Sequence, residues 1–207
     1  MRNMQEKEGV FSYKTKSRIL FFLFLILIVL LYAFKNYSFF LRVASAIGFI
    51  LIFYLADYTF KINFELRHYF YIFFISLNSF LFSPLFYIFI PYDKILHLLN
   101  PLVVASIIFF TVDKLKIKLK WKILFVFFIV AGIVGLFEIG EYILDVAFDW
   151  KMQGVYVRDL LSLEKLKILQ DSINDTMQDM ILGIVGGIIY SVIAILFYRT
   201  RRLRKYL

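Results

Sequence analysis

The 207-residue chain contains no cysteine and only two histidines, His68 and His97. The lack of cysteine excludes disulfides, thiolate metal sites and cysteine nucleophiles. A serine–histidine nucleophile motif, a Walker loop and a HExxH zinc motif are also absent, which leaves the reaction type of any enzyme open. The chain has no internal repeat and no low-complexity linker, which predicts one domain.

What the chain has in abundance is apolar side chains. Its composition is 62% hydrophobic and 20% aromatic, and its mean hydropathy is +0.80, whereas soluble domains contain about 45–50% apolar residues. The composition predicts an all-α, polytopic helical bundle that crosses the cell (plasma) membrane, with the lipid bilayer as its partner. The 26 Phe and 14 Tyr are spread evenly, which favours lipid-facing bulk over an aromatic recognition surface.

Six segments approach the length of about 20 apolar residues that a membrane-spanning helix needs. They cover about residues 19–34, 39–56, 69–90, 94–112, 121–148 and 177–198. Pro84 and Pro91 predict a kink or an early end in the third. A basic stretch precedes the first segment without a small-x-small cleavage site, so we expect an uncleaved anchor. We predict a six-helix transmembrane domain over 19–198, between a basic cytoplasmic segment at 1–18 and a basic cytoplasmic tail at 199–207.

The distribution of charge indicates the orientation, because short basic loops stay on the cytoplasmic side. With the N-terminus inside, the inner segments hold 17 of the 24 basic and 5 of the 15 acidic residues. Both termini should therefore be cytoplasmic. The net charge of +9 fits this topology better than nucleic-acid binding. The basic run "KLKIKLKWK" at 114–122 could bind anionic lipid, but we favour a role in setting topology.

The acidic residues of the outer side gather in three polar motifs that share one membrane level. On a helix with about 100° per residue, "GLFEIGEYILD" (135–145) places Glu138, Glu141 and Asp145 on one face. In "QDSINDTMQDMILG" (170–183), Asp171, Asp175 and Asp179 recur every four residues, beside Asn174 and Gln178. In "PYDKILHLLNP" (91–101), Asp93, His97 and Asn100 align. With a rise of about 1.5 Å per residue, all three motifs reach the outer end of the membrane core.

Polar residues at helix ends are common, since snorkelling and interfacial water reduce their cost. Glu138 is harder to explain this way. It lies about 26 Å up a core about 30 Å thick and toward a helix C-terminus, which disfavours an anion. An acid inside a membrane indicates a functional site, and its expected partners are His97 with Asp175 or Asp179.

Glycines on the fifth and sixth segments predict close helix packing. They are Gly132, Gly135 and Gly140 on the fifth, and Gly183, Gly186 and Gly187 on the sixth. Gly183 and Gly187 have the small-xxx-small spacing that permits a close approach. The amphipathic stretch "LLSLEKLKIL" (160–169) predicts a loop helix that packs on the bundle, although it could also dock a partner or lie on the membrane surface.

The three motifs together resemble those of the YjdF-type inner-membrane proteins and, more faintly, of the VanZ-like proteins. "YDKILH" (92–97), "GLFEIGEY" (135–142) and "NDTMQDM" (174–180) occur in that order. The resemblance covers about residues 70–198 and implies a helical membrane fold with a shared polar site, but it supplies no substrate. The VanZ-like proteins are associated with altered glycopeptide sensitivity, which points to envelope chemistry. The chain lacks their Gln and Pro-Gly-Arg elements.

Three functions fit these residues. We rank the enzyme first, the structural or interaction protein second and the transporter third. In the first, a divalent metal ion such as Mg²⁺, Mn²⁺, Zn²⁺ or Fe²⁺ serves an enzyme that acts on a lipid-linked or envelope substrate at the outer face. The candidate metal ligands are Glu138, Glu141, Asp175 and Asp179, and the candidate catalytic residues are His97 and Asp93. In the second, the cluster is an interhelical network or a docking surface for an unidentified protein. In the third, it binds a transported cation or relays protons.

Overall fold

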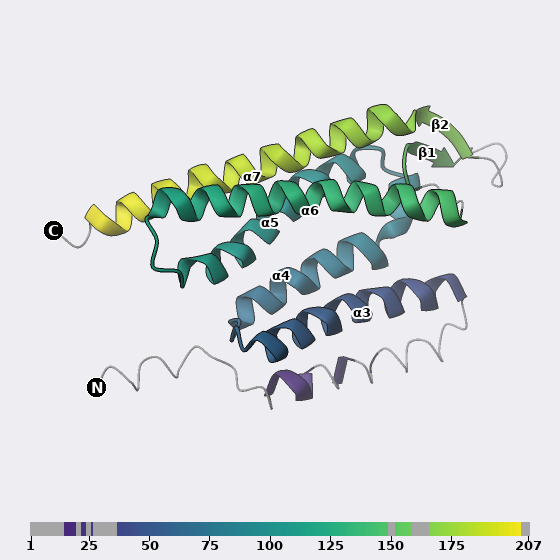
Figure 1. Cartoon of the computed structure of the whole chain (residues 1–207). Helices are drawn as coiled ribbons and strands as arrows, with labels where there is room; N and C mark the ends of the chain where they lie inside the picture. The colour runs from purple at the N-terminus through teal and green to yellow at the C-terminus, as the bar shows by residue number, and fades with distance from the viewer. Residues whose placement is uncertain are drawn as a thin grey trace. The chain divides into compact units, whose positions relative to one another are not determined.

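The computed structural model describes residues 15–19, 22–23, 26, 37–148, 152–158 and 166–203. They fall into two compact units, Met1–Pro84 and Leu85–Leu207, which we call unit 1 and unit 2. Figure 1 shows that helices dominate both units. The predicted helix over 19–34 lies mostly outside the described residues.

Unit 1 is built on the long helix α3 (Tyr37–Phe60), against which α4 (Leu66–Ser76) packs. α4 passes into a π-helical turn, η1 (Leu77–Leu81), and then a 3-10 turn, η2 (Ser83–Tyr87), which crosses into unit 2. Pro84 explains the break, because proline has no N–H and its ring clashes with the carbonyl four residues earlier. The predicted interruption of segment 69–90 is confirmed.

A buried carboxylate, that of Asp57, connects separate segments of unit 1 through hydrogen bonds. Asp57 is fully buried near the end of α3 and accepts hydrogen bonds from Lys16 Nζ at 2.5 Å, Tyr69 Oη at 2.6 Å and the Phe64 N–H at 3.1 Å. It therefore joins the α3–α4 turn to a residue that precedes α3 by a long stretch of chain. His68, the second histidine, is also buried; its Nδ1 accepts from the Glu65 N–H at 3.2 Å in the capping box of α4.

Unit 2 is a bundle of three helices, α5 (Pro91–Asp113), α6 (Leu119–Phe148) and α7 (Ser172–Leu203), and each packs against the other two. α5 begins at Pro91, a position where proline's missing N–H leaves no hydrogen bond unmade. A short basic turn reverses the chain between α5 and α6. The bundle core consists of Ala105, Val112, Val126, Val130 and Val134.

A β-hairpin joins α6 to α7 at the opposite end of unit 2 (Figure 1). β1 (Val155–Arg158) pairs antiparallel with β2 (Leu166–Gln170), with an irregularity between Val155 and Tyr156. The chain is mostly helical, as predicted, and this hairpin is an addition to that fold. The helix predicted over 160–169 is wrong for residues 166–169, which belong to strand β2. Residues 159–165 lie outside the described part of the chain.

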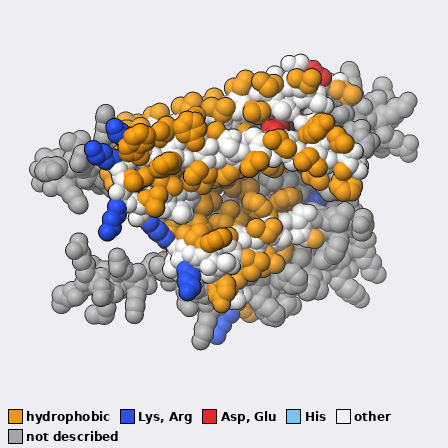
Figure 2. Space-filling model, viewed as in Figure 1, with side chains coloured by type: hydrophobic (Ala, Val, Ile, Leu, Met, Phe, Trp, Pro, Cys, Tyr) orange, Lys and Arg blue, Asp and Glu red, His pale blue; other side chains and the backbone are white. Residues whose placement is uncertain are grey.

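Within the described residues, four helical segments are long and apolar enough to cross a membrane. They are Arg42–Phe60, Pro91–Asp113, Leu119–Phe148 and Ser172–Tyr198. Apolar side chains cover most of the surface of the described residues in Figure 2, and Phe128, Leu136 and Ile181 on α6 and α7 are each more than half exposed. Such an outer surface is typical of helices that face lipid. The count of six spans, the orientation and the domain limits stay predictions.

Glycines on α7, and none on α6, make the close contacts. A Cβ on Gly183 would lie 2.7 Å from two methyl groups of Val134 on α6, and a Cβ on Gly186 would meet the Leu98 carbonyl oxygen of α5. By contrast, a Cβ at Gly132, Gly135 or Gly140 would find no atom within 4 Å among the described residues. The predicted packing role is therefore confined to the glycines of α7.

Candidate functional site

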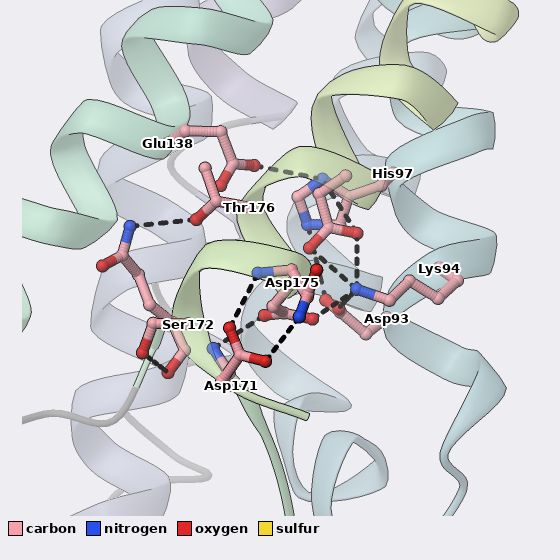
Figure 3. Close-up of polar contacts among 12 residues, drawn as sticks. Asp93, Lys94, His97, Glu138, Asp171, Ser172, Asp175 and Thr176 are labelled. Atoms are coloured by element: carbon pink, nitrogen blue, oxygen red, sulfur yellow. Dashed lines mark hydrogen bonds and ion pairs between the residues drawn. The ribbon is translucent and has the colours of Figure 1, made fainter. Parts of the chain in front are cut away.

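Three helix segments that are far apart in the sequence meet at the hairpin end of unit 2. The bundle topology brings together the first turns of α5, the last third of α6 and the first turns of α7 (Figures 1 and 3). Asp93 lies in the first turn of α5 and Asp175 in the first turn of α7. The positive ends of both helix dipoles favour carboxylates there. We call Asp93, Lys94, His97, Glu138, Asp175 and Asp179 the polar cluster.

The Lys94 ammonium lies among three carboxylates of the polar cluster. Its Nζ donates to Asp179 Oδ1 at 2.8 Å and Oδ2 at 3.0 Å, and it also donates to Asp175 Oδ1. Asp93 Oδ2 is 3.3 Å away. Both aspartates of α7 are almost fully buried, so this lysine supplies the charge that lets them lie inside the bundle.

The imidazole of His97 lies between carboxylates of all three helices. Its Nε2 is 3.4 Å from Asp93 Oδ1, and its Nδ1 is 3.5 Å from Glu138 Oε1 and 4.0 Å from Asp179 Oδ1. Hydrogen bonds of good geometry are shorter, at about 2.7–3.2 Å. His97 is therefore close to three acids but held tightly by none, and it packs edge-on against the Phe137 ring.

Glu138 is the least compensated member of the polar cluster. It is 3% exposed, and neither of its carboxylate oxygens forms a hydrogen bond. The carboxylate points toward His97, and Thr176 lies beside it (Figure 3). A buried charge without hydrogen-bond partners is costly, so this side chain is the feature of the bundle that internal contacts explain least.

The loop residues 152–154 contact the C-terminal end of α6 and the N-terminal end of α7. Asp145 on α6 accepts from the Met152 N–H at 2.7 Å and the Gln153 N–H at 2.8 Å. The Gly154 N–H donates to Asp175 Oδ2 at 2.7 Å, with the Gly154 φ angle at 97°, where a residue with a Cβ would be strained. The Gln153 side chain donates to Thr176. Asp145 therefore holds the loop and lies outside the cluster, and Asp175 has both oxygens engaged.

Asp171 also serves local structure. It precedes α7 and accepts from the Asn174 N–H at 3.0 Å and the Asn174 side-chain amide at 2.6 Å. These hydrogen bonds, the backbone one foremost, lower the pKa of this exposed carboxyl. Gln178 is exposed as well. Of the acidic stripe predicted on α7, only Asp175 and Asp179 face the bundle.

Five acids in this region face two cationic or titratable groups. Glu141 lies one turn beyond Glu138, half-buried, without a hydrogen bond or ion pair to any described residue. If all five acids (Glu141, Asp93, Glu138, Asp175 and Asp179) were ionised, their negative charge would exceed the positive charge that Lys94 and His97 can supply. Asp93, His97 and Asp179 each offer one ligand atom, and these atoms lie within 4.8 Å of one another.

The distances between the ligand atoms of Asp93, His97 and Asp179 can be compared with those between the ligands of one bound metal ion. Ligand atoms at about 2.1 Å from one first-row metal ion lie at most about 4.2 Å apart, whereas oxygen ligands of Ca²⁺ at about 2.4 Å can be about 4.8 Å apart. Binding of a small divalent ion by all three groups would require a slight contraction of the group. The roles predicted for Asp93, His97, Glu138, Glu141, Asp175 and Asp179 stay predictions.

Lys94 is the residue that sequence reasoning missed. It lies inside the quoted motif "YDKILH", next to Asp93, but the charge count treats it only as one of the basic residues of the outer side. A lysine beside an aspartate, one helical turn from an intramembrane histidine, is a signal that could have found it.

The apolar outer surface, the four long helices and the buried polar cluster define an integral membrane protein of the helical class. Within that class, the chain belongs to the family described as "Predicted membrane protein (DUF2238)", whose model matches residues 17–201. The match gives no support to the fainter resemblance to the VanZ-like proteins. Searches of curated proteins and of solved structures found no match.

Proposed function

We propose that this protein is a membrane enzyme with a divalent cation bound by Asp93, His97 and Asp179, and with Glu138 as a fourth ligand. The observation that carries the proposal is the buried Glu138 carboxylate, which has no hydrogen bond and points at His97. A cation at this position would compensate Glu138 and reduce the repulsion among neighbouring acids.

The ligand chemistry suits Mg²⁺, Mn²⁺, Zn²⁺ or Fe²⁺, because three carboxylates and one imidazole form a mixed oxygen and nitrogen set. Such an ion supplies a Lewis acid or an activated water. Asp175 is a weaker candidate ligand than expected, since Lys94 and the Gly154 N–H engage its two oxygens. Glu141 remains a candidate as a further ligand or as the general base. A cluster set among lipid-facing helices favours a lipid-linked or envelope substrate.

A second candidate function is an interhelical polar network without catalysis. It is favoured by one observation, the contacts of Lys94 on α5 with both Asp175 and Asp179 on α7. In that case the polar cluster serves to join α5 to α7, and no metal is needed.

Elemental analysis of the full chain purified in detergent distinguishes the two functions. We expect close to one equivalent of a divalent metal in the wild type. Glu138→Gln and Asp179→Asn should retain far less metal, since each removes one anionic ligand and should lower the affinity for the metal at least tenfold. Asp113→Asn, a carboxylate at the far end of α5, is the matched control and should retain the metal. A metal-free wild type that unfolds at the same temperature with and without added Mn²⁺ or Zn²⁺ would rule out the cation site.

We further propose that the cluster opens to the outer face of the plasma membrane, with both termini in the cytoplasm, and that the YjdF-type resemblance refers to the family that the chain matches. The absence of cysteine makes the orientation directly testable with single-cysteine variants. A cysteine at Ser172 should react with a membrane-impermeant maleimide on intact cells, whereas one at Lys116 should react only after the membrane is opened. The reverse pattern would place the site on the cytoplasmic side.

A further inference from the structure

Lys94 and the proposed cation share ligands. The ammonium approaches both oxygens of Asp179, at 2.8 and 3.0 Å, and lies 3.3 Å from Asp93. Asp93 and Asp179 are also two of the three groups whose ligand atoms lie within 4.8 Å of one another. A divalent ion bound there would be only a few ångströms from the ammonium, and like charges at that distance inside a low-dielectric bundle repel strongly. The two cations would therefore compete for these carboxylates.

The lysine has an alternative position close by. Its Nζ also donates to Asp175 Oδ1, an atom outside the proposed ligand group. The Asp175 carboxylate is held in place by the Gly154 N–H through its other oxygen. The lysine side chain is 21% exposed and has a flexible four-carbon stem, so it can leave Asp179 and remain paired with Asp175.

We propose that Lys94 competes with a divalent cation for the cation site. In the metal-free protein the Lys94 ammonium pairs with Asp179 and Asp175, and when a divalent cation binds it leaves Asp179 and pairs with Asp175 alone. This inference rests on the proposed cation site and adds how its affinity is regulated. In the metal-free bundle, Lys94 serves as the counter-ion of the carboxylates. The lysine stabilises the empty site and lowers its affinity for the metal.

The test is Mn²⁺ binding to the full chain in detergent, measured by titration for the wild type and for Lys94→Gln. We expect the variant to bind Mn²⁺ about tenfold or more tightly, since it removes the competing charge and leaves the ligands in place. Lys122→Gln is the matched control. Like Lys94, Lys122 donates to an aspartate, Asp113 at 2.8 Å, but it lies on α6 at the other end of the bundle. The Mn²⁺ affinity of this variant should therefore equal that of the wild type.

The possible outcomes separate this inference from the cation site itself. Equal or weaker binding by Lys94→Gln than by the wild type overturns the competition and leaves the cation site standing. Binding by Lys94→Gln alone supports the competition and contradicts a metal in the native protein. No binding by either overturns both proposals.

A measurement on the wild type keeps the inference testable if Lys94→Gln does not fold. Lysine acetylation is read by mass spectrometry with and without saturating Mg²⁺. We expect Mg²⁺ to raise the labelling of Lys94 at least severalfold, because an ammonium that has left Asp179 is less protected, and to leave Lys122 unchanged. Unchanged or reduced labelling of Lys94 in a protein that binds Mg²⁺ overturns the competition.

Discussion

Replacing Asp57 by alanine is expected to destabilise unit 1 by about 3–5 kcal/mol, because it leaves a buried ammonium without its carboxylate. Lys16 is 4% exposed and lies 2.5 Å from Asp57, which is itself fully buried. The Tyr69 hydroxyl and the Phe64 N–H lose the same acceptor. The free energy of unfolding, from denaturant titration of the full chain in detergent, measures the effect.

Two variants show whether the cost comes from the buried charge. Arg67→Gln breaks the ion pair of Arg67 with Glu65, whose side chains are 58% and 38% exposed, and should cost at most about 1 kcal/mol. The double variant Lys16→Met with Asp57→Leu removes both charges together and should recover a large part of the loss. If the double variant were as unstable as Asp57→Ala, the lost hydrogen bonds, and not the loss of the carboxylate charge beside Lys16, would explain the instability.

Asp57 also shows which contacts cannot be predicted from the sequence. Hydropathy identified α3, α5, α6 and α7, because long apolar runs carry a strong signal, and Pro84 marked the break after α4. The partner of Asp57 could not be inferred, since Lys16 precedes it by 41 residues and counts in the sequence only as a basic residue before the first predicted span. Local patterns do not report such distant pairs.

The hairpin was missed for a related reason. Residues 160–169 have apolar and charged residues at helical spacing, yet Leu166–Gln170 pairs with Val155–Arg158. A run of five residues fits either period, and only the presence of a partner strand decides between them.

The polar cluster was more accessible to sequence reasoning, because helix rise and periodicity convert spacing into depth and direction. They placed His97, Glu138 and Asp179 at one level, and the contact expected between Glu138 and His97 is present at 3.5 Å. They could not separate Asp145 and Asp171, which bond to nearby backbone N–H groups, from acids that face the bundle. That difference depends on the loop after α6 and on the turn before α7.

Replacing Gly186 by alanine is expected to destabilise unit 2 by about 1–3 kcal/mol, the usual cost of overpacking. A Cβ at this position would meet the Leu98 carbonyl oxygen, which is backbone and cannot rotate away, so α5 and α7 would have to separate. Gly135→Ala is the matched control. Its Cβ would find nothing within 4 Å, and alanine favours a helix over glycine by about 1 kcal/mol, so this variant should be neutral or slightly more stable.

The effect of Gly186→Ala should also reach the polar cluster. Gly186 lies two turns after Asp179 on the same face of α7, and Leu98 follows His97 directly on α5. A wider gap between these helices would lengthen the contacts of Lys94 with Asp179, which depend on the close approach of α5 and α7. Melting temperatures in detergent should therefore fall for Gly186→Ala, fall less for Gly183→Ala, whose neighbour is the movable Val134 side chain, and stay unchanged or rise for Gly135→Ala. Equal losses in all three variants would mean that the helix backbone, and not the packing of α7 on α5, sets the stability.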